Sequence, residues 1–150
     1  MTKRENIIQA LIARVGSIDK ATGYHFTVGG ESYVRRSLPT SDFNQAPLAC
    51  VWELEETRTR THYGITKKVL LVRIEIAVPT EVEPCYDANR VLEDLEKAIL
   101  TREGEETELW NLVEDILDVK AEIARPQIGN PITGAAMEFS VHYQTPVGQP

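Results

Sequence analysis

The most constraining feature of the sequence is a period-two pattern within residues 66–78, where every second position from Leu70 to Val78 is apolar. Successive side chains of a β-strand point to opposite faces, so positions two apart share a face. The apolar positions on one face are Leu70, Val72, Ile74, Ile76 and Val78. The other face carries Arg73 and Glu75. The segment therefore predicts a strand with one side on a hydrophobic core.

Three further segments predict strands by the same alternation. Residues 48–54 place one set on a single face: Leu48, Cys50, Trp52 and Leu54. In residues 117–124 the shared face carries Val119, Ala121 and Ile123. In the last predicted strand it carries Met137, Phe139, Val141 and Tyr143. The strands at 48–54 and 66–78 are expected to pair across residues 55–65 as an extended hairpin whose tip is rich in Thr and Arg.

Shorter elements and loops are expected between these strands. Residues 24–28 and 32–35 are interpreted as short strands around the turn signal Gly29-Gly30. Prolines and small polar residues predict loops over 38–47 and 125–134. The tail, residues 146–150, is expected to be mobile or held only by a partner.

Two amphipathic helices are predicted, over residues 3–15 and 87–101. Thr2 followed by Glu5 fits a capping box, and Gly16 is a reasonable end. Asp87 is expected in the cap region of the second helix, which should end near Gly104. Its apolar stripe is Ala88, Val91, Leu92, Leu95, Ala98 and Ile99, with Arg90, Glu93, Asp94, Glu96 and Lys97 on the polar side. Residues 108–116 predict a short helical turn.

This order of elements predicts one α+β domain over residues 1–150. We expect a mainly antiparallel β-sheet with two α-helices packed on one face and a protruding β-hairpin. The other sheet face carries mixed residues that suit either solvent or a subunit interface: Val69, Leu71, Arg73, Glu75, Val51 and Glu53. The chain has no apolar run near the ~20 residues that a membrane helix needs, and no signal-peptide pattern. We therefore expect a cytoplasmic protein without membrane contact, at least until it joins a larger assembly.

Charge is unevenly distributed along the chain, whose net charge is −7. Residues 1–80 hold 11 Lys and Arg against 8 Asp and Glu, whereas residues 81–150 hold 5 against 15. This asymmetry fits a subunit with one basic and one acidic surface, and it equally fits a solvated acidic helix face.

Residue types that can take part in catalysis or metal binding are present, but their spacing in the sequence does not match the motifs of such sites. The three histidines, His25, His62 and His142, have no metal-ligand spacing. Cys50 and Cys85 form no Cys-x-x-Cys motif and are expected to be reduced thiols. No Gly-x-Ser-x-Gly elbow or phosphate-binding glycine motif occurs. We expect no enzyme activity, no metal and no cofactor.

The one basic feature is the segment 57–63, in which Arg and Thr alternate before an aromatic residue. Its candidate interface or lumen residues are Arg58, Arg60, His62 and Tyr63. On a protruding hairpin they suit contact with phosphate backbones or with an acidic protein surface. A solvated hairpin without a ligand explains the same composition equally well.

The arrangement resembles the tail terminator, or tail completion, proteins of long-tailed bacteriophages. The resemblance rests on the helix at 4–15, the strand at 69–78, the helix at 88–100 and the closing strand 137–145 with its Gly/Pro tail, and it covers nearly the whole chain. It implies a virion protein that forms a ring, commonly a homohexamer, on the head-proximal end of the tail tube. Such a ring ends tube polymerisation and offers the surface for head–tail joining.

The partners implied by the resemblance are copies of the chain, the tail tube protein, the head–tail connector or neck proteins, and genomic DNA that passes through the lumen without sequence-specific binding. Two alternatives stay open at this point. One is another phage neck, minor tail or adaptor protein, and the other is a small enzyme.

Overall fold

A five-stranded sheet organises the chain, as the computed structural model shows for residues 2–36, 46–61, 63–102, 108–124 and 131–149. The strands lie in the order β1-β2-β3-β5-β4. Their bounds are Val34–Arg35 (β1), Leu48–Arg60 (β2), Ile65–Pro79 (β3), Asp115–Ile123 (β4) and Ile132–Pro146 (β5). The pair β1–β2 is parallel and the other three pairs are antiparallel. The predicted α+β class and its mainly antiparallel sheet are confirmed.

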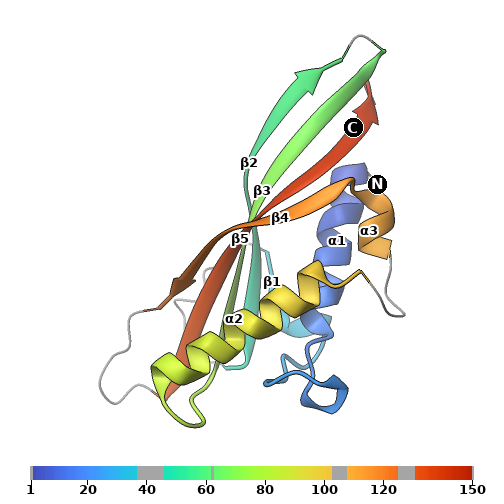
Figure 1. Cartoon of the computed structure of the whole chain (residues 1–150). Helices are drawn as coiled ribbons and strands as arrows, with labels where there is room; N and C mark the ends of the chain where they lie inside the picture. The colour runs from blue at the N-terminus through green and yellow to red at the C-terminus, as the bar shows by residue number, and fades with distance from the viewer. Residues whose placement is uncertain (1, 37–45, 62, 103–107, 125–130, 150) are drawn as a thin grey trace.

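Two main helices pack against this sheet, as predicted, and a short third one accompanies them (Figure 1). They are α1 (Lys3–Gly16), α2 (Pro84–Leu100) and α3 (Glu108–Leu112). The hydroxyl of Thr2 accepts a hydrogen bond from the Glu5 amide at 3.1 Å, as the capping prediction requires. The buried guanidinium of Arg14 donates to the carbonyl oxygens of Ala98 and Thr101. This contact joins α1 to the negative end of the α2 dipole.

The second helix starts earlier and ends earlier than predicted. Pro84 occupies its first turn, and the Glu83 carboxylate caps it by accepting from the amides of Cys85 and Tyr86. Asp87 is therefore not the N-cap. Its fully buried carboxylate instead accepts from the amides of Glu81 and Val82, at 2.7 and 3.0 Å. The helix ends at Leu100, before the Gly104 region.

Asp94 corrects two predictions at once. It was expected on the polar side of α2, but it is buried and accepts from the backbone amides of His25 and Phe26 at 2.9 and 3.0 Å. Because a carboxylate occupies these amides, residues 24–28 form no strand. Residues 31–33 form a short 3₁₀ turn, and only Val34–Arg35 pairs as a strand. The predicted loop 38–47 lies outside the described residues up to position 45.

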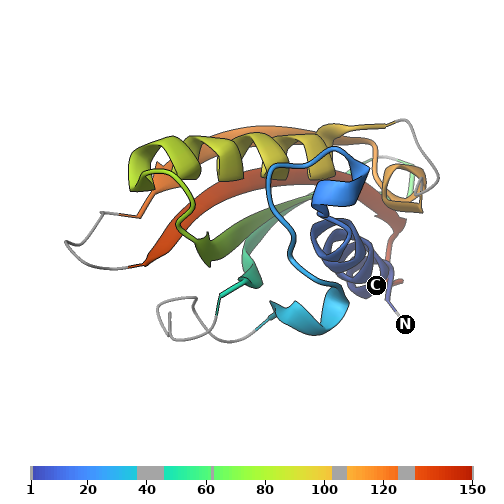
Figure 2. The same cartoon turned by 90° about the horizontal axis from the view of Figure 1, so that it is seen from below.

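The core lies between α1, α2 and one face of the sheet, which we call the covered face (Figure 2). The predicted alternation of β3 and β5 is confirmed, since Leu70, Val72 and Ile74 are fully buried. Their partners across the sheet include Val141, Phe139 and Met137. The opposite face of the sheet is called the open face.

The predicted facing of β2 is wrong. Ala49 and Val51 lie opposite Ile76 and Ile74 and belong to the core, whereas the predicted set that begins with Leu48 lies on the open face. Alternation alone cannot choose between the two faces here, because residues 48–51 are buried on both. A bulge between Glu53 and Glu55 then shifts the phase of the strand.

The predicted facing of strand β4 is also partly wrong. A bulge between Asp118 and Lys120 takes Val119 out of the face that Ala121 and Ile123 share, and Val119 is 59% exposed. At its far end, the predicted loop 125–134 is too long, because β5 begins at Ile132. Residues 125–130 lie outside the described part of the chain.

Strands β2, β3 and β5 continue beyond the helices as a three-stranded ribbon (Figure 1). This is the protruding hairpin of the prediction, with β5 added along its length. The ribbon rises beside the start of α1, where Lys3 Nζ donates to the Gln144 carbonyl at 2.9 Å. The two chain ends consequently lie close together in both views (Figures 1 and 2).

Candidate functional site

The predicted site residues lie at and near the end of the ribbon. Arg58 and Arg60 are in β2 and not in the connecting loop, because β2 runs to Arg60. Tyr63 lies in the turn and is 89% exposed. His62 lies outside the described residues. The structure thus brings the two arginines onto one strand face and leaves Tyr63 at the tip.

Two cross-strand rows place these arginines beside residues that sequence reasoning missed. Arg58 is opposite Lys68, which is opposite Tyr143, and Arg60 is opposite Thr66, which is opposite Thr145. Both rows continue the covered face beyond the row of Leu70 and Val141. One face of the sheet therefore changes from apolar to cationic where the helices end.

These rows form the wall of a hollow that we call the basic groove. It has a volume of about 380 Å³ and is lined by Arg58, Arg60, Thr66, Lys68, Thr145, Pro146, Gly148 and Gln149. Its last three residues come from the tail, where the Val147 amide donates to the Gly64 carbonyl at 2.8 Å. The tail segment is thereby tied to the turn between β2 and β3.

A hydrogen-bonded cluster lies at the base of the groove. The Tyr143 hydroxyl donates to the Glu56 carboxylate, whose side chain is 4% exposed. Arg58 Nε lies 2.7 Å from the same carboxylate, and Arg4 Nη1 lies 3.7 Å from it. Burial raises the pKa of Glu56, but the bonds from Tyr143 and Arg58 outweigh it, so the net pKa is lowered. Burial and the bond to Glu56 raise the pKa of Tyr143.

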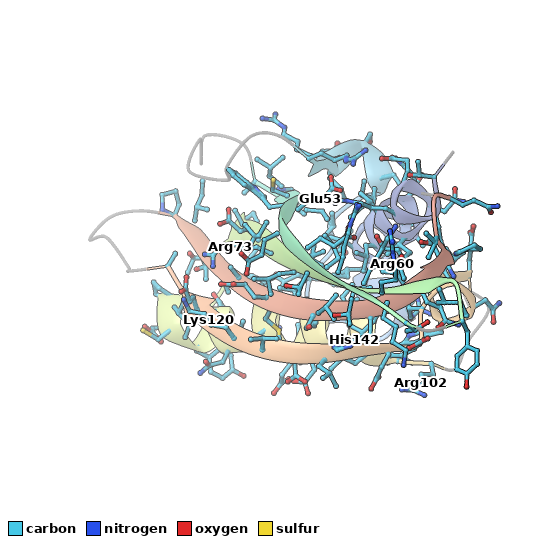
Figure 3. All side chains as sticks on the ribbon, turned by 90° about the horizontal axis from the view of Figure 1, so that it is seen from above. Glu53, Arg60, Arg73, Arg102, Lys120 and His142 are labelled. Atoms are coloured by element: carbon cyan, nitrogen blue, oxygen red, sulfur yellow. The ribbon has the colours of Figure 1, made fainter. Side chains whose placement is uncertain are left out.

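The open face carries a separate charged network around Arg73. The guanidinium contacts Glu75 at 2.8 Å, Glu122 at 2.9 Å and Glu138 at 3.3 Å, and so joins β3, β4 and β5. Lys120 pairs with two of the same carboxylates. Figure 3 places Arg73 and Lys120 on one side of the view and Arg60 on the other. All charges of this network have partners, so it is a structural feature of the sheet.

Both edges of the sheet offer backbone for pairing. β4 pairs with β5 alone within the described residues, and it exposes Leu117, Val119 and Ile123. On the opposite edge, β1 covers only Ala49 and Cys50 of β2. Within the described part of the chain, the rest of β2 up to Arg60 has β3 as its sole strand neighbour. Unpaired edges with apolar side chains are templates for strand addition.

The described residues do not meet the requirements of a metal site. Among the described residues, no group of three or more His, Cys, Asp or Glu side chains is placed to hold a metal ion. Cys50 is buried and Cys85 is exposed. In the same part of the chain, every helix is too short or too polar to cross a bilayer.

Comparison with known proteins adds no relative. No protein-family model matches the chain, and no curated protein matches it. The resemblance to tail terminator proteins therefore stays a hypothesis.

Proposed function

We propose that this chain is a structural subunit that closes into a homohexameric ring at the head-proximal end of a phage tail tube. The ring ends tube polymerisation and presents the surface for head–tail joining. The family resemblance of the element order motivates this assignment. The observation that carries it is that, among the described residues, two edges on opposite sides of one sheet have no further strand partner: β4, and β2 from Val51 to Arg60.

Two different edges on one subunit suit a heterologous contact. The β4 edge of one copy meets the β2 edge of the next, and a constant rotation between copies closes a ring. The apolar side chains of Leu117, Val119 and Ile123 lose solvent exposure in such a contact. Each strand added also satisfies backbone groups that water otherwise solvates.

The remaining surfaces then serve the other partners of the proposal. The ribbon extends beyond the helices and carries the basic groove, so it suits a position near the genomic DNA or on an acidic neighbour. The tail tube protein and the head–tail connector take the two ends of the ring. The function is structural and requires no catalysis.

Sedimentation and electron microscopy of the purified chain test this proposal, alone and with tail tubes. We expect a discrete six-fold ring, free or on one end of the tubes. The variant Val119→Lys places a charge on the β4 edge and should leave a folded monomer. Val82→Lys is the matched control, because Val82 is 68% exposed and lies between β3 and α2, outside both edge strands. A chain that stays monomeric with and without tubes contradicts the proposal, as does a ring that Val119→Lys leaves intact.

A further inference from the structure

We propose that the basic groove binds a phosphate group, either as a free anion or as part of a nucleic-acid backbone. The site is complete within one subunit, so the inference goes beyond ring formation and does not depend on it. It rests on an excess of positive charge, a buried lysine and a buried hydroxyl that has no hydrogen-bond partner among the described residues.

The positive charge of the groove exceeds what its own carboxylate neutralises. Glu56 is already matched by Arg58 and Arg4 and accepts from Tyr143. Arg60 and Lys68 form no ion pair with any described residue. Two cations therefore face the hollow without a counterion from the part of the chain that is described.

Lys68 is the less usual of the two cations. It is 6% exposed, and its Nζ lies 5.7 Å from the centroid of the Tyr143 ring. Most of the side chain is covered, but Nζ is not among the fully buried atoms without a partner, so the ammonium still meets solvent, which an anion can replace. Because Lys68 lines the groove, a bound anion can reach this ammonium.

Thr145 supplies the second observation. The residue is 3% exposed, and its hydroxyl oxygen is fully buried without a hydrogen-bond partner among the described residues. Buried polar atoms in folded proteins almost always have a partner. The residue lines the same groove and shares a row with Thr66 and Arg60. Because this oxygen is closed to solvent, a bound anion accepts from the hydroxyl only once the Thr145 side chain turns toward the groove.

The set of donors favours phosphate. Arginine, lysine and threonine side chains are the usual contacts of phosphate oxygens. A phosphate monoester or inorganic phosphate offers more oxygens and more charge than a carboxylate does. It can engage Arg60, Lys68 and a hydroxyl from different directions, whereas a carboxylate is satisfied by one arginine fork. The groove volume of about 380 Å³ accommodates such a group together with an attached nucleotide segment.

Isothermal titration calorimetry at low ionic strength tests the inference, with inorganic phosphate in one arm and a single-stranded oligonucleotide without terminal phosphate in the other. Lys68→Met keeps the length of the side chain and removes its charge, and Arg60→Gln alters an exposed position that the fold does not need. Each should weaken binding about tenfold or more, the loss of one charge-assisted contact. Lys67→Gln is the matched control, because Lys67 is exposed on the opposite face of the same strand. The affinity of this variant for either ligand should stay within about twofold of that of the parent.

The two arms separate the sources of the phosphate. If the oligonucleotide binds and responds to Lys68→Met and Arg60→Gln, the groove holds a backbone phosphodiester, and the affinity falls with salt. If only inorganic phosphate responds, the ligand is a free anion. The inference is overturned if neither ligand binds at millimolar concentration, or if the two groove variants bind as the parent does. Ring closure is measured independently by sedimentation, so either proposal can fail while the other holds.

Discussion

The hydroxyl of Tyr143 on β5 donates a hydrogen bond to the carboxylate of Glu56 on β2, across the intervening strand β3. This contact marks the boundary between two parts of one sheet face. Glu56 belongs to the row of Leu70 and Val141, which is part of the core, and Tyr143 belongs to the first of the two rows of the basic groove. Because the contact spans three strands, it also holds the base of the ribbon to the body of the domain.

We first predict that Tyr143→Phe lowers the free energy of unfolding by about 1.5–3 kcal/mol, the usual cost of losing one hydrogen bond to a charged group. The ring keeps its packing, and Glu56 keeps its contacts with Arg58 and Arg4. Urea unfolding followed by circular dichroism measures the change. Tyr63→Phe is the control, because Tyr63 is 89% exposed at the turn and should not alter stability. Equal stability of the two variants would show that the contact to Glu56 contributes nothing.

Alkaline pH should destabilise the protein partly through the same tyrosine. Burial and the bond to Glu56 raise the pKa of Tyr143 in the folded state above its ordinary value of about 10. The contribution is complete below pH ~10, and it is lost above that pH because the unfolded chain releases a proton that the folded chain retains. The loss approaches about 1.4 kcal/mol per pH unit for one such group. The free energy of unfolding should therefore fall less steeply between pH 9 and 11 in Tyr143→Phe than in the parent. Parallel curves of this free energy against pH would contradict the prediction.

The two arginines of the ribbon should behave differently when their charge is reversed. Arg58→Glu places a second carboxylate against Glu56, which is almost fully buried, and should destabilise the fold by about 2–3 kcal/mol. Arg60→Glu changes an exposed side chain that has no ion pair among the described residues, and should alter stability by less than about 0.5 kcal/mol. Thermal unfolding of both variants checks this. Equal effects on stability would mean that Glu56 does not distinguish the two positions.

Sequence patterns predicted the central part of the fold because β3 is apolar at every second position from Leu70 to Val78, and β5 alternates from Met137 to Gln144. The same period extends beyond the apolar residues to those of the groove. Thr66 and Lys68 are in phase with Leu70, and Thr145 is in phase with Tyr143, so the groove residues were already on the core face of the predicted strands. Extending each alternation past its last apolar residue would have identified them.

Other features were beyond local patterns. The bulges after Glu53 and Asp118 depend on pairing with a neighbouring strand, and no residue type at these positions predicts them. Asp87 and Asp94 are charged residues of a kind expected on a solvated helix face. Each nevertheless accepts hydrogen bonds from backbone amides, Asp87 from a segment several residues away and Asp94 from one far away in the sequence. The partner of a buried carboxylate is set by tertiary structure, so the sequence alone assigns it to solvent.

The last prediction concerns Arg73, which joins three strands on the open face. Arg73→Met removes the positive charge that lies between Glu75, Glu122 and Glu138, and leaves these carboxylates to repel one another. We expect a loss of about 1–2 kcal/mol in the free energy of unfolding, since the side chain is only 24% exposed and makes several charge-assisted bonds. Lys120→Met is the control on the same face. Its side chain is 54% exposed, so the loss should stay below about 0.5 kcal/mol. Because salt screens partly exposed charges, the difference between parent and Arg73→Met should shrink as sodium chloride is added during urea unfolding. A difference that persists unchanged in high salt would assign the effect to packing of the arginine stem and not to its charge.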